Sequence, residues 1–309
     1  MIQRNVSLKD YSNYKIGGPA EFFLEVHSKD ELIKGLNEWK QTGLQKPIFV
    51  LGKGTNLLIS DRGFEGLVIL DLIKGIERDG NEITAGAGEL MSDVLDFCID
   101  NSLSGLEWAG GLPGTIGGAV RGNAGAFKGE TKDSVLEVKS LNLDTLEEVK
   151  RENKDLLFDY RYSVFKSKAK NEIILTVTLR LQGGDKEVIR EATQDKINYR
   201  NEKHPMEYPN IGSTFKNIRQ ELVPQEFREE LMQYAKDDPF PIIPVAKVLY
   251  LCGLKGKREG DAQISKKHPN FIVNLGNAKF EDVKKLIEFA KETVKNKYRI
   301  ELEEEIMYL

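Results

Sequence analysis

The sequence contains few of the residues that carry metal chemistry or form disulfide frameworks. Its 309 residues include two cysteines, Cys98 and Cys252, and three histidines. The cysteines form no CxxC pattern and the histidines are scattered, so neither a disulfide framework nor a transition-metal site is predicted. We therefore expect no metal cofactor.

The chain also has no large excess of charge of one sign and no long hydrophobic run. The chain has 45 basic and 49 acidic residues, a net charge of −4 and a pI near 5.7, which leaves no electrostatic footprint for nucleic acid or an anionic membrane. The N-terminus has no signal-peptide-like apolar segment, and uncharged stretches such as 108–120 are too short and glycine-rich to cross a bilayer. We expect a cytoplasmic protein that binds neither nucleic acid nor a membrane.

Glycine is scarce in the second part of the chain and concentrated in the first. Of 28 glycines, 21 lie in residues 1–129, nine of them between Gly105 and Gly129, and only seven follow. Interleaved Ile, Leu, Val and Trp argue against disorder, and the absence of a three-residue period excludes a collagen-like chain. These glycines predict tight turns and close backbone approaches in a folded N-terminal region.

Hydrophobic patterning predicts an α+β fold. A capping box at 28–31 predicts a helix through Trp39. Further helices are predicted from about residue 90 to 99 and at 187–198, 226–235, 245–252 and 281–295. Strands are predicted at 47–51, 57–60, 67–71, 83–87, 270–274 and 299–308. Between 134 and 182, including 160–165, alternating apolar residues predict an antiparallel sheet.

The standard nucleotide-binding motifs are absent, although two glycine-rich loops are present. The segment from Gly52 to Leu57 lacks the third glycine of the dinucleotide fingerprint, and no P-loop motif occurs. Segments 52–57 and 110–118, the latter followed by 123–125, have the composition of two backbone-amide nests that could hold a pyrophosphate. The alternative is that both loops are ordinary hairpin turns.

Several sequence blocks, taken in order, resemble the UDP-N-acetylenolpyruvoylglucosamine reductase family. The blocks are 16–20, 52–58, 110–118, 123–126, 160–165, 212–217, 253–256, 267–273 and 302–305. The resemblance covers about residues 16 to 306. It implies a two-subdomain FAD-binding fold of the vanillyl-alcohol-oxidase type at 1–72 and 73–184, followed by a C-terminal α+β substrate-binding domain at 185–309.

The same resemblance implies a reaction and its cofactors. NADPH would reduce a non-covalent FAD, and the enolpyruvyl ether of UDP-N-acetyl-enolpyruvoylglucosamine would become the lactyl ether of UDP-N-acetylmuramate, a peptidoglycan precursor. The chain would act as a monomer. The short segment between Ser163 and Arg180 resembles the shorter, second-type subclass. Ile218 replaces the family's usual proline, and the connection 220–244 is longer than usual.

Three residues match the family's catalytic positions. Arg161 would clamp the substrate carboxylate, Ser213 would donate the proton, and Glu305 would polarise the carboxylate or hold the proton-transfer network. Each has a simpler interpretation: an ion pair with Asp159 or another acid for Arg161, a local backbone hydrogen bond for Ser213, and a solvated acidic edge for Glu305. Glu303 and Glu305 share one face of an extended segment, and only the motif register favours Glu305.

The resemblance also implies two sets of binding residues. The FAD-binding set is Gly52, Lys53, Gly54, Thr55, Asn56, Leu57, Gly110, Pro113, Gly114, Thr115, Ile116, Gly118, Asn123, Ala124 and Gly125. The substrate-binding set is Arg200, Lys203, Lys216 and Asn217. Solvated basic side chains at a helix end are an equal alternative for Arg200 and Lys203. His268 has no predicted catalytic role, and Cys98 is predicted to lie in the core.

Two other functions compete with this interpretation. Another FAD oxidoreductase of the same fold would often attach its flavin to a histidine, yet His27 is the only histidine before His204 and is far in sequence from the glycine loops. A catalytically silent UDP-sugar-binding homologue would lack at least one of Arg161, Ser213 and Glu305, and all three are present.

Overall fold

The computed structural model describes all 309 residues, which divide by their contacts into two units. Unit 1 comprises Met1–Val6, Ala20–Lys53 and Glu65–Tyr199, and unit 2 comprises Ser7–Pro19, Gly54–Phe64 and Arg200–Leu309. Unit 2 therefore includes two N-terminal segments, which a division into consecutive segments does not anticipate. The functional boundaries expected at residues 72 and 184 stay a prediction.

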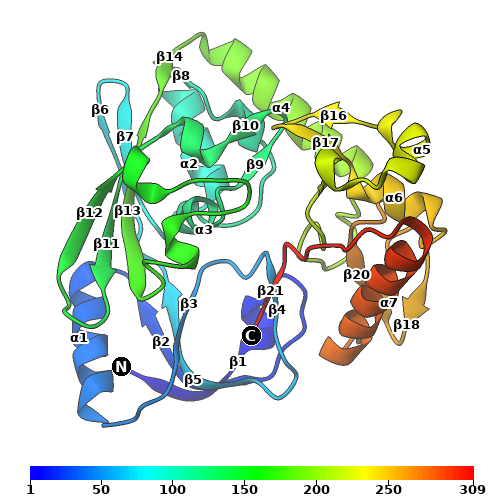
Figure 1. Ribbon diagram of the computed structural model, residues 1–309. Coiled ribbons are helices and arrows are strands. Elements are labelled where there is room, and N and C mark those ends of the chain that lie inside the picture. Colours follow the sequence, from blue (N-terminus) through cyan, green and yellow to red (C-terminus); the bar gives the residue numbers. More distant parts are fainter. The chain divides into compact units, whose positions relative to one another are not determined.

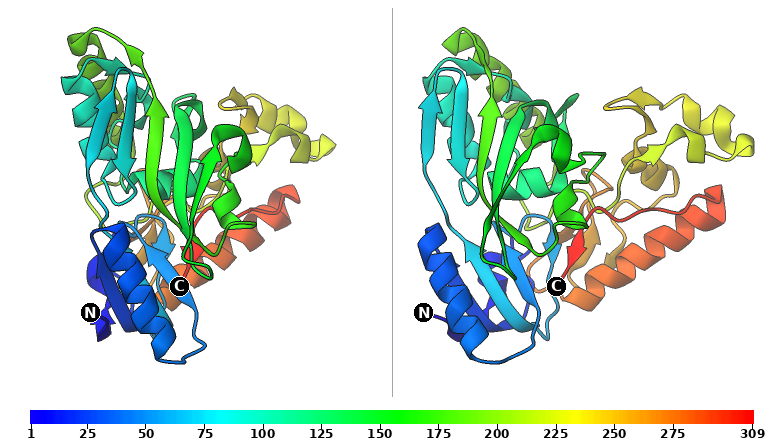
Figure 2. Two further views of the ribbon diagram at one scale, coloured as in Figure 1. Left: turned by 90° about the vertical axis from the view of Figure 1, so that its left-hand side faces the viewer. Right: turned by 60° about the vertical axis from the view of Figure 1, so that its left-hand side comes forward.

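The first layer of unit 1 is a four-stranded sheet covered by a helix. Its strand order is β1-β2-β5-β3, with β1 (Gln3–Ser7), β2 (Pro19–Val26), β3 (Ile48–Leu51) and β5 (Phe64–Asp71). Helix α1 (Lys29–Gln41) lies along one face (Figures 1 and 2) and buries Leu32, Leu36 and Trp39 against it. The predicted cap is confirmed, since the Ser28 hydroxyl accepts from the Glu31 N–H at 3.2 Å.

The second layer of unit 1 is a five-stranded antiparallel sheet. Its order is β12-β11-β13-β7-β6, with β6 (Ile76–Asp79), β7 (Glu82–Gly86), β11 (Val135–Asn142), β12 (Glu148–Glu152) and β13 (Glu172–Arg180). Helices α2 (Met91–Asp100) and α3 (Ile116–Gly122) share its core. Cys98 is buried there as predicted, and burial raises the pKa of its thiol to about 12.

Short elements complete unit 1. They are β8 (Leu103–Ser104) paired with β14 (Gln182–Gly183), β9 (Gly125–Ala126) paired with β10 (Gly129–Glu130), and the 3-10 turns η2 (Glu107–Ala109), η3 (Thr131–Asp133), η4 (Asn153–Leu156) and η5 (Val164–Lys166). The helix predicted at 187–198 is present as α4 (Lys186–Lys203), whose last residues belong to unit 2.

The strand predicted at 160–165 is wrong. Asp159 and Tyr162 exchange backbone hydrogen bonds of 3.1 and 3.0 Å, which close a tight turn. Arg161 inside that turn has a φ of 55°, in the left-handed region, so the chain cannot continue as an extended strand. The alternation of apolar residues here marks a compact turn followed by η5.

Unit 2 is built from small sheets around one long helix. The sheets are β15-β17-β16, with β15 (Ile218–Arg219), β16 (Lys236–Asp237) and β17 (Pro241–Ile243); β18-β19-β20, with β18 (Arg258–Glu259), β19 (Ala262–Ile264) and β20 (Ile272–Asn274); and β4 (Leu57–Leu58) parallel to β21 (Met307–Tyr308). The helices are η1 (Leu8–Tyr11), η6 (Gln220–Leu222), η7 (Gln225–Phe227), α5 (Arg228–Met232), α6 (Val245–Leu251) and α7 (Phe280–Tyr298). Helix α7 packs on β18 and β19 and buries Val283, Ile287 and Val294.

The C-terminal strand predicted at 299–308 forms only at Met307–Tyr308. Arg299 ends α7 in a left-handed conformation with a φ of 55°. Residues 303–305 then bond to a loop and not to a neighbouring strand. The Lys216 N–H donates to the Glu303 carbonyl, and the Glu305 N–H donates to the Thr214 carbonyl. Without a regular ladder the segment is extended but is not a strand. No helix of the structure is both long and apolar enough to cross a membrane.

Candidate active site

Ser213 and Glu305, the two predicted catalytic residues of unit 2, lie on neighbouring backbone segments. The Glu305 N–H donates to the carbonyl of Thr214, the residue after Ser213, at 2.9 Å, and Phe215 forms a β-bridge with Glu304. Gly212, before Ser213, has a φ of 83°, and a Cβ there would meet no atom within 4 Å. The structure therefore brings the backbone segments that carry Ser213 and Glu305 next to each other, although they are far apart in sequence.

Lysines pair with three carboxylates of the acidic C-terminal block. The pairs are Lys295 with Glu301 at 2.8 Å, Lys216 with Glu303, and Lys291 with Glu304 at 2.9 Å. The Glu303 side chain is 71% exposed, which places it toward solvent. The backbones of both Glu303 and Glu305 bond to the loop that carries Ser213, so the choice of Glu305 as the carboxylate of the site stays a prediction.

Asn270 holds the Ser213 loop and was not predicted as a site residue. Its side chain accepts from the Phe215 N–H at 3.0 Å and donates to the Phe215 carbonyl at 2.8 Å, while its own carbonyl accepts from the Thr214 N–H at 2.7 Å. It is only 4% exposed. The sequence block 267–273 marked its importance, but no local pattern could identify its distant partner.

Arg161, the third predicted catalytic residue, belongs to unit 1. Its Nη2 donates to the Gly125 carbonyl at 3.0 Å, and its guanidinium carbon lies 5.1 Å from the centre of the Tyr160 ring. The Asn123 side chain donates to the Asp159 carbonyl at 3.0 Å and to Glu130 at 3.2 Å, tying the turn of Arg161 to the β9–β10 hairpin. The Arg161 backbone thus lies in a left-handed turn, and its guanidinium is held by the Gly125 carbonyl.

Most glycines of the predicted FAD loops are required by the protein itself. A Cβ on Gly52 would lie 2.8 Å from the Thr115 hydroxyl, which brings the two loops together within unit 1. A Cβ on Gly110 would lie 2.4 Å from the Thr193 carbonyl, and one on Gly117 would lie 2.9 Å from the Ala87 Cβ. These distances are too short for any side chain.

Gly118 differs from these glycines in a way that suits a cofactor. A Cβ there would meet only the Thr115 hydroxyl, at 3.4 Å, so protein packing does not require glycine, whereas a ligand lying close to the backbone would. The loop thus fits the family's cofactor. Asn123, by contrast, is fully buried and supports the loop, and the Asn56 amide bonds the Glu305 carbonyl at 3.0 Å. Their roles toward FAD stay predictions, as do those of the rest of the set.

The predicted substrate-binding residues differ in their surroundings within unit 2. Arg200 is buried at 8% exposure, while Lys203 pairs with Glu202 on the surface. Lys216 pairs with Glu303, and the Asn217 side chain accepts from the Val245 N–H at 3.2 Å. The structure places Lys216 and Asn217 on the loop after Ser213 and leaves the substrate contacts of all four as predictions.

Two partly buried histidines of unit 2 form an aromatic cluster with the buried Phe271. The rings of His204 and His268 are 5.3 Å apart, and each lies 4.9 Å from the Phe271 ring. Burial lowers the pKa of both histidines to about 4, and for His204 the neighbouring His268, Arg200 and Lys267 add to this effect. Both imidazoles are therefore neutral near pH 7 and pack as partly buried aromatic side chains.

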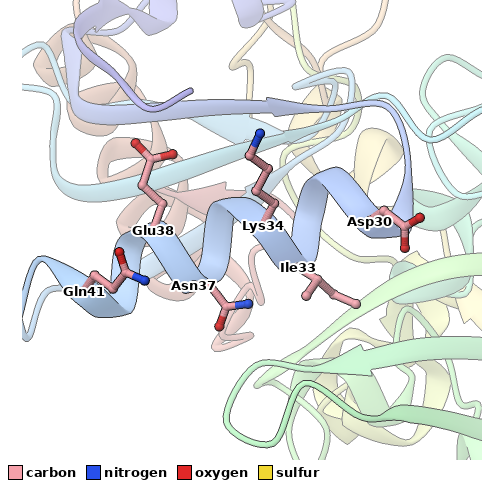
Figure 3. A pocket seen from close by; sticks show the side chains of 6 residues that line it. All are labelled: Asp30, Ile33, Lys34, Asn37, Glu38 and Gln41. Atoms are coloured by element: carbon pink, nitrogen blue, oxygen red, sulfur yellow. The ribbon is translucent and has the colours of Figure 1, made fainter.

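A surface hollow lies away from the predicted residues. It has a volume of about 540 Å³ and runs along α1, lined by Asp30, Ile33, Lys34, Asn37, Glu38 and Gln41 (Figure 3). All six side chains come from one helix and none is a predicted site residue. A hollow beside one polar helix face offers no converging groups, so it is not a candidate active site.

Comparisons with known proteins identify the family to which the chain belongs. A family model described as "FAD binding domain" matches residues 20–145, and one described as "UDP-N-acetylenolpyruvoylglucosamine reductase, C-terminal domain" matches residues 204–309. Two relatives called UDP-N-acetylenolpyruvoylglucosamine reductase, from Clostridium novyi and Listeria welshimeri, are 35% and 37% identical to this chain. Each covers 99% of it, over 91% and 94% of their own lengths.

A crystal structure of UDP-N-acetylenolpyruvylglucosamine reductase from Thermus caldophilus matches the whole fold. It has a TM-score of 0.76 and 29% identity, covering 100% of this chain and 99% of that one. Together these findings define the class as an FAD-dependent oxidoreductase with a distinct C-terminal domain, which confirms the predicted fold class. The chain belongs to the UDP-N-acetylenolpyruvoylglucosamine reductase family.

Proposed function

We propose that the chain reduces UDP-N-acetylenolpyruvoylglucosamine to UDP-N-acetylmuramate with NADPH, using Arg161, Ser213 and Glu305. The proposal of the reaction rests on relatives of that name aligned over 99% of the chain. The observation that supports Ser213 and Glu305 is the backbone bond between Glu305 and Thr214, and Arg161 is proposed from its match to the family motif. The expected monomeric state stays a prediction.

FAD, when bound, supplies the hydride that NADPH provides, and the protein supplies charge and a proton. Addition of hydride at C3 of the enolpyruvyl group leaves negative charge on C2 and its carboxylate, so a fixed cation there lowers the barrier. Arg161 provides that cation, since its guanidinium can bind a carboxylate through two parallel hydrogen bonds and stays charged. Its bond to the Gly125 carbonyl fixes its direction.

The proton must reach C2, and Ser213 is the proposed donor. A serine hydroxyl is a weak acid in water, but the carbanion formed at C2 is a strong base, so a positioned hydroxyl suffices. Asn270 fixes the loop of Ser213 through its bonds to Thr214 and Phe215. Glu305 lies beside that loop and would hold the proton-transfer network in place.

The test compares NADPH consumption by the purified protein with and without the enolpyruvyl UDP-sugar. We expect a yellow protein whose flavin is released by denaturation and whose NADPH oxidation depends on that substrate. UDP-N-acetylglucosamine, which lacks the enolpyruvyl group, serves as the control and should not support turnover. A flavin-containing protein that binds the substrate but does not turn it over would identify the silent homologue instead.

A further inference from the structure

The hairpin β9–β10 has an unusual tip. The Gly125 carbonyl of its first strand accepts the hydrogen bond from Arg161. Gly129 pairs with Ala126 and Glu130 with Gly125, so Phe127 and Lys128 form a two-residue loop. Both have a positive φ, of 52° and 69°. Such turns favour Asn-Gly, because side-chain-bearing residues are strained in this conformation. A bulky aromatic residue at a strained position persists only where its surroundings hold it.

Helix α4 provides those surroundings. The Phe127 ring meets the Tyr199 ring edge-on, with centroids 5.2 Å apart at 87°, and the Lys196 Nζ lies 5.4 Å from the Phe127 centroid. Lys196 and Tyr199 are three residues apart and so share one face of α4. The helix is itself seated on the glycine loop, since a Cβ on Gly110 would lie 2.4 Å from the Thr193 carbonyl. The hairpin tip therefore packs on α4 through the Phe127 ring.

The base of the same hairpin holds the guanidinium of Arg161. The Gly125 carbonyl accepts from Nη2 at 3.0 Å, and a Cβ on Gly125 would lie 3.4 Å from Nη1. The Asn123 side chain also bonds both Glu130 in the hairpin and the Asp159 carbonyl in the turn of Arg161. A movement of the hairpin would therefore move the acceptor that directs the guanidinium.

We infer that Phe127 is a positioning residue for Arg161, holding the hairpin through Tyr199 so that the Gly125 carbonyl keeps the guanidinium aimed at the substrate carboxylate. The inference rests on the proposed function, in which Arg161 binds that carboxylate. In the proposed reaction, Phe127 touches neither the substrate nor the flavin. A misplacement of about 1 Å in a catalytic group costs on the order of 10²-fold in rate, so we expect Phe127→Ala to lower turnover by about 10-fold to 100-fold.

A double-mutant cycle in the holoenzyme tests whether the effect passes through Arg161. Turnover of the enolpyruvyl substrate is measured for Phe127→Ala, Arg161→Ala and the double variant. Residues that act through one group are non-additive, so Phe127→Ala should have little further effect once Arg161 is alanine. Reduction of the flavin by NADPH, measured at equal FAD content, should fall much less in Phe127→Ala than turnover of the enolpyruvyl substrate. Full additivity of the two losses would overturn the inference.

A second variant separates the ring contact from backbone strain. Phe127→Asn combined with Lys128→Gly places the favoured turn residues at the tip, so the hairpin should form at least as well as in the native chain. It still lacks the ring that meets Tyr199, and we expect the same loss of turnover as for Phe127→Ala. Phe127→Tyr, which keeps the ring edge, should retain activity. Native turnover in the Asn-Gly variant would show that the ring contact is not needed.

Ligand binding gives a readout independent of turnover. Calorimetry compares UDP-N-acetylmuramate, which carries the carboxylate, with UDP-N-acetylglucosamine, which does not. Phe127→Ala should weaken only the first, by about 10-fold, and Phe289→Ala, which removes a 44% exposed ring from α7, should weaken neither. If Arg161→Ala has native affinity and turnover, the proposed role of Arg161 is wrong. If Arg161→Ala loses affinity and turnover but Phe127→Ala keeps both, only the inference about Phe127 is wrong.

Discussion

The glycine loops of unit 1 and the Ser213 loop of unit 2 are held by different contacts. In unit 1, glycines let two backbone segments pack closely because glycine has no side chain. At Gly110, a Cβ would lie only 2.4 Å from the Thr193 carbonyl oxygen. In unit 2, buried amide side chains connect distant segments: Asn270 bonds Phe215, and Asn274 donates to the Tyr14 carbonyl at 3.0 Å. Close-packed glycines bring loops together and Gly118 leaves its backbone open, whereas asparagine links fix a loop that carries a chemical group.

The largest expected effect tests whether the asparagine-held loop of unit 2 carries the proton donor, Ser213. Ser213→Ala should lower turnover of the enolpyruvyl substrate by about 10² to 10⁴-fold, the range for a lost general acid. NADPH should still reduce the flavin in this variant, because Ser213 acts only on the substrate. Rapid-mixing measurement of both half-reactions separates the two steps. An equal loss in both would contradict Ser213 as the proton donor.

Opposite pH dependence is expected from buried titratable groups of the two units. In unit 1, burial raises the pKa of Asp71 to about 7, so its folded form holds a proton that the unfolded chain has already lost. Its contribution is full below about pH 4 and is lost as the pH rises to 7. Asp71→Asn keeps an acceptor for the Ile73 N–H and should raise stability at pH 8 by up to about 4 kcal/mol. Little difference is expected at pH 4.

The histidine cluster of unit 2 should behave in the reverse sense. The pKa of His204 and of His268 is lowered to about 4 by burial, so the unfolded chain binds protons first as the pH falls. Their contribution is full above about pH 6.5 and is lost between there and pH 4. His204→Phe should therefore reduce the fall in Tm between pH 7 and pH 5, measured by calorimetry. An unchanged profile would mean that the cluster is solvated.

A smaller effect tests the glycine contacts of unit 1. A Cβ on Gly129 would lie 2.3 Å from the Trp108 ring, whereas one on Gly122 would meet nothing within 4 Å. Gly129→Ala should cost about 1–3 kcal/mol through overpacking, and the matched Gly122→Ala, in α3, should be neutral or stabilise by up to about 1 kcal/mol. Urea denaturation measures both. Equal stability of the two variants would remove the distinction between structural and open glycines.

Local signals in the sequence were sufficient where neighbours along the chain decide the structure. The Ser28 cap, the apolar stripe of α1 and the alternation of β11 and β13 all reappear as predicted. The segments 160–165 and 299–306 fail for the same reason. Their extended patterns are overridden by left-handed residues, Arg161 and Arg299, and by bonds to segments distant in sequence, which no local period reveals.

The sequence by itself determined the family, the FAD-binding class and the α+β composition, because motif order and periodicity are written along the chain. Only the tertiary structure decided which glycines serve packing, as Gly117 does, and which leave space, as Gly118 does. It also decided that the backbones of Glu303 and Glu305 bond to the Ser213 loop and that the Glu303 side chain pairs with Lys216. These choices depend on contacts between residues up to about ninety positions apart, and side-chain direction there is set by packing and hydrogen bonding, not by local pattern.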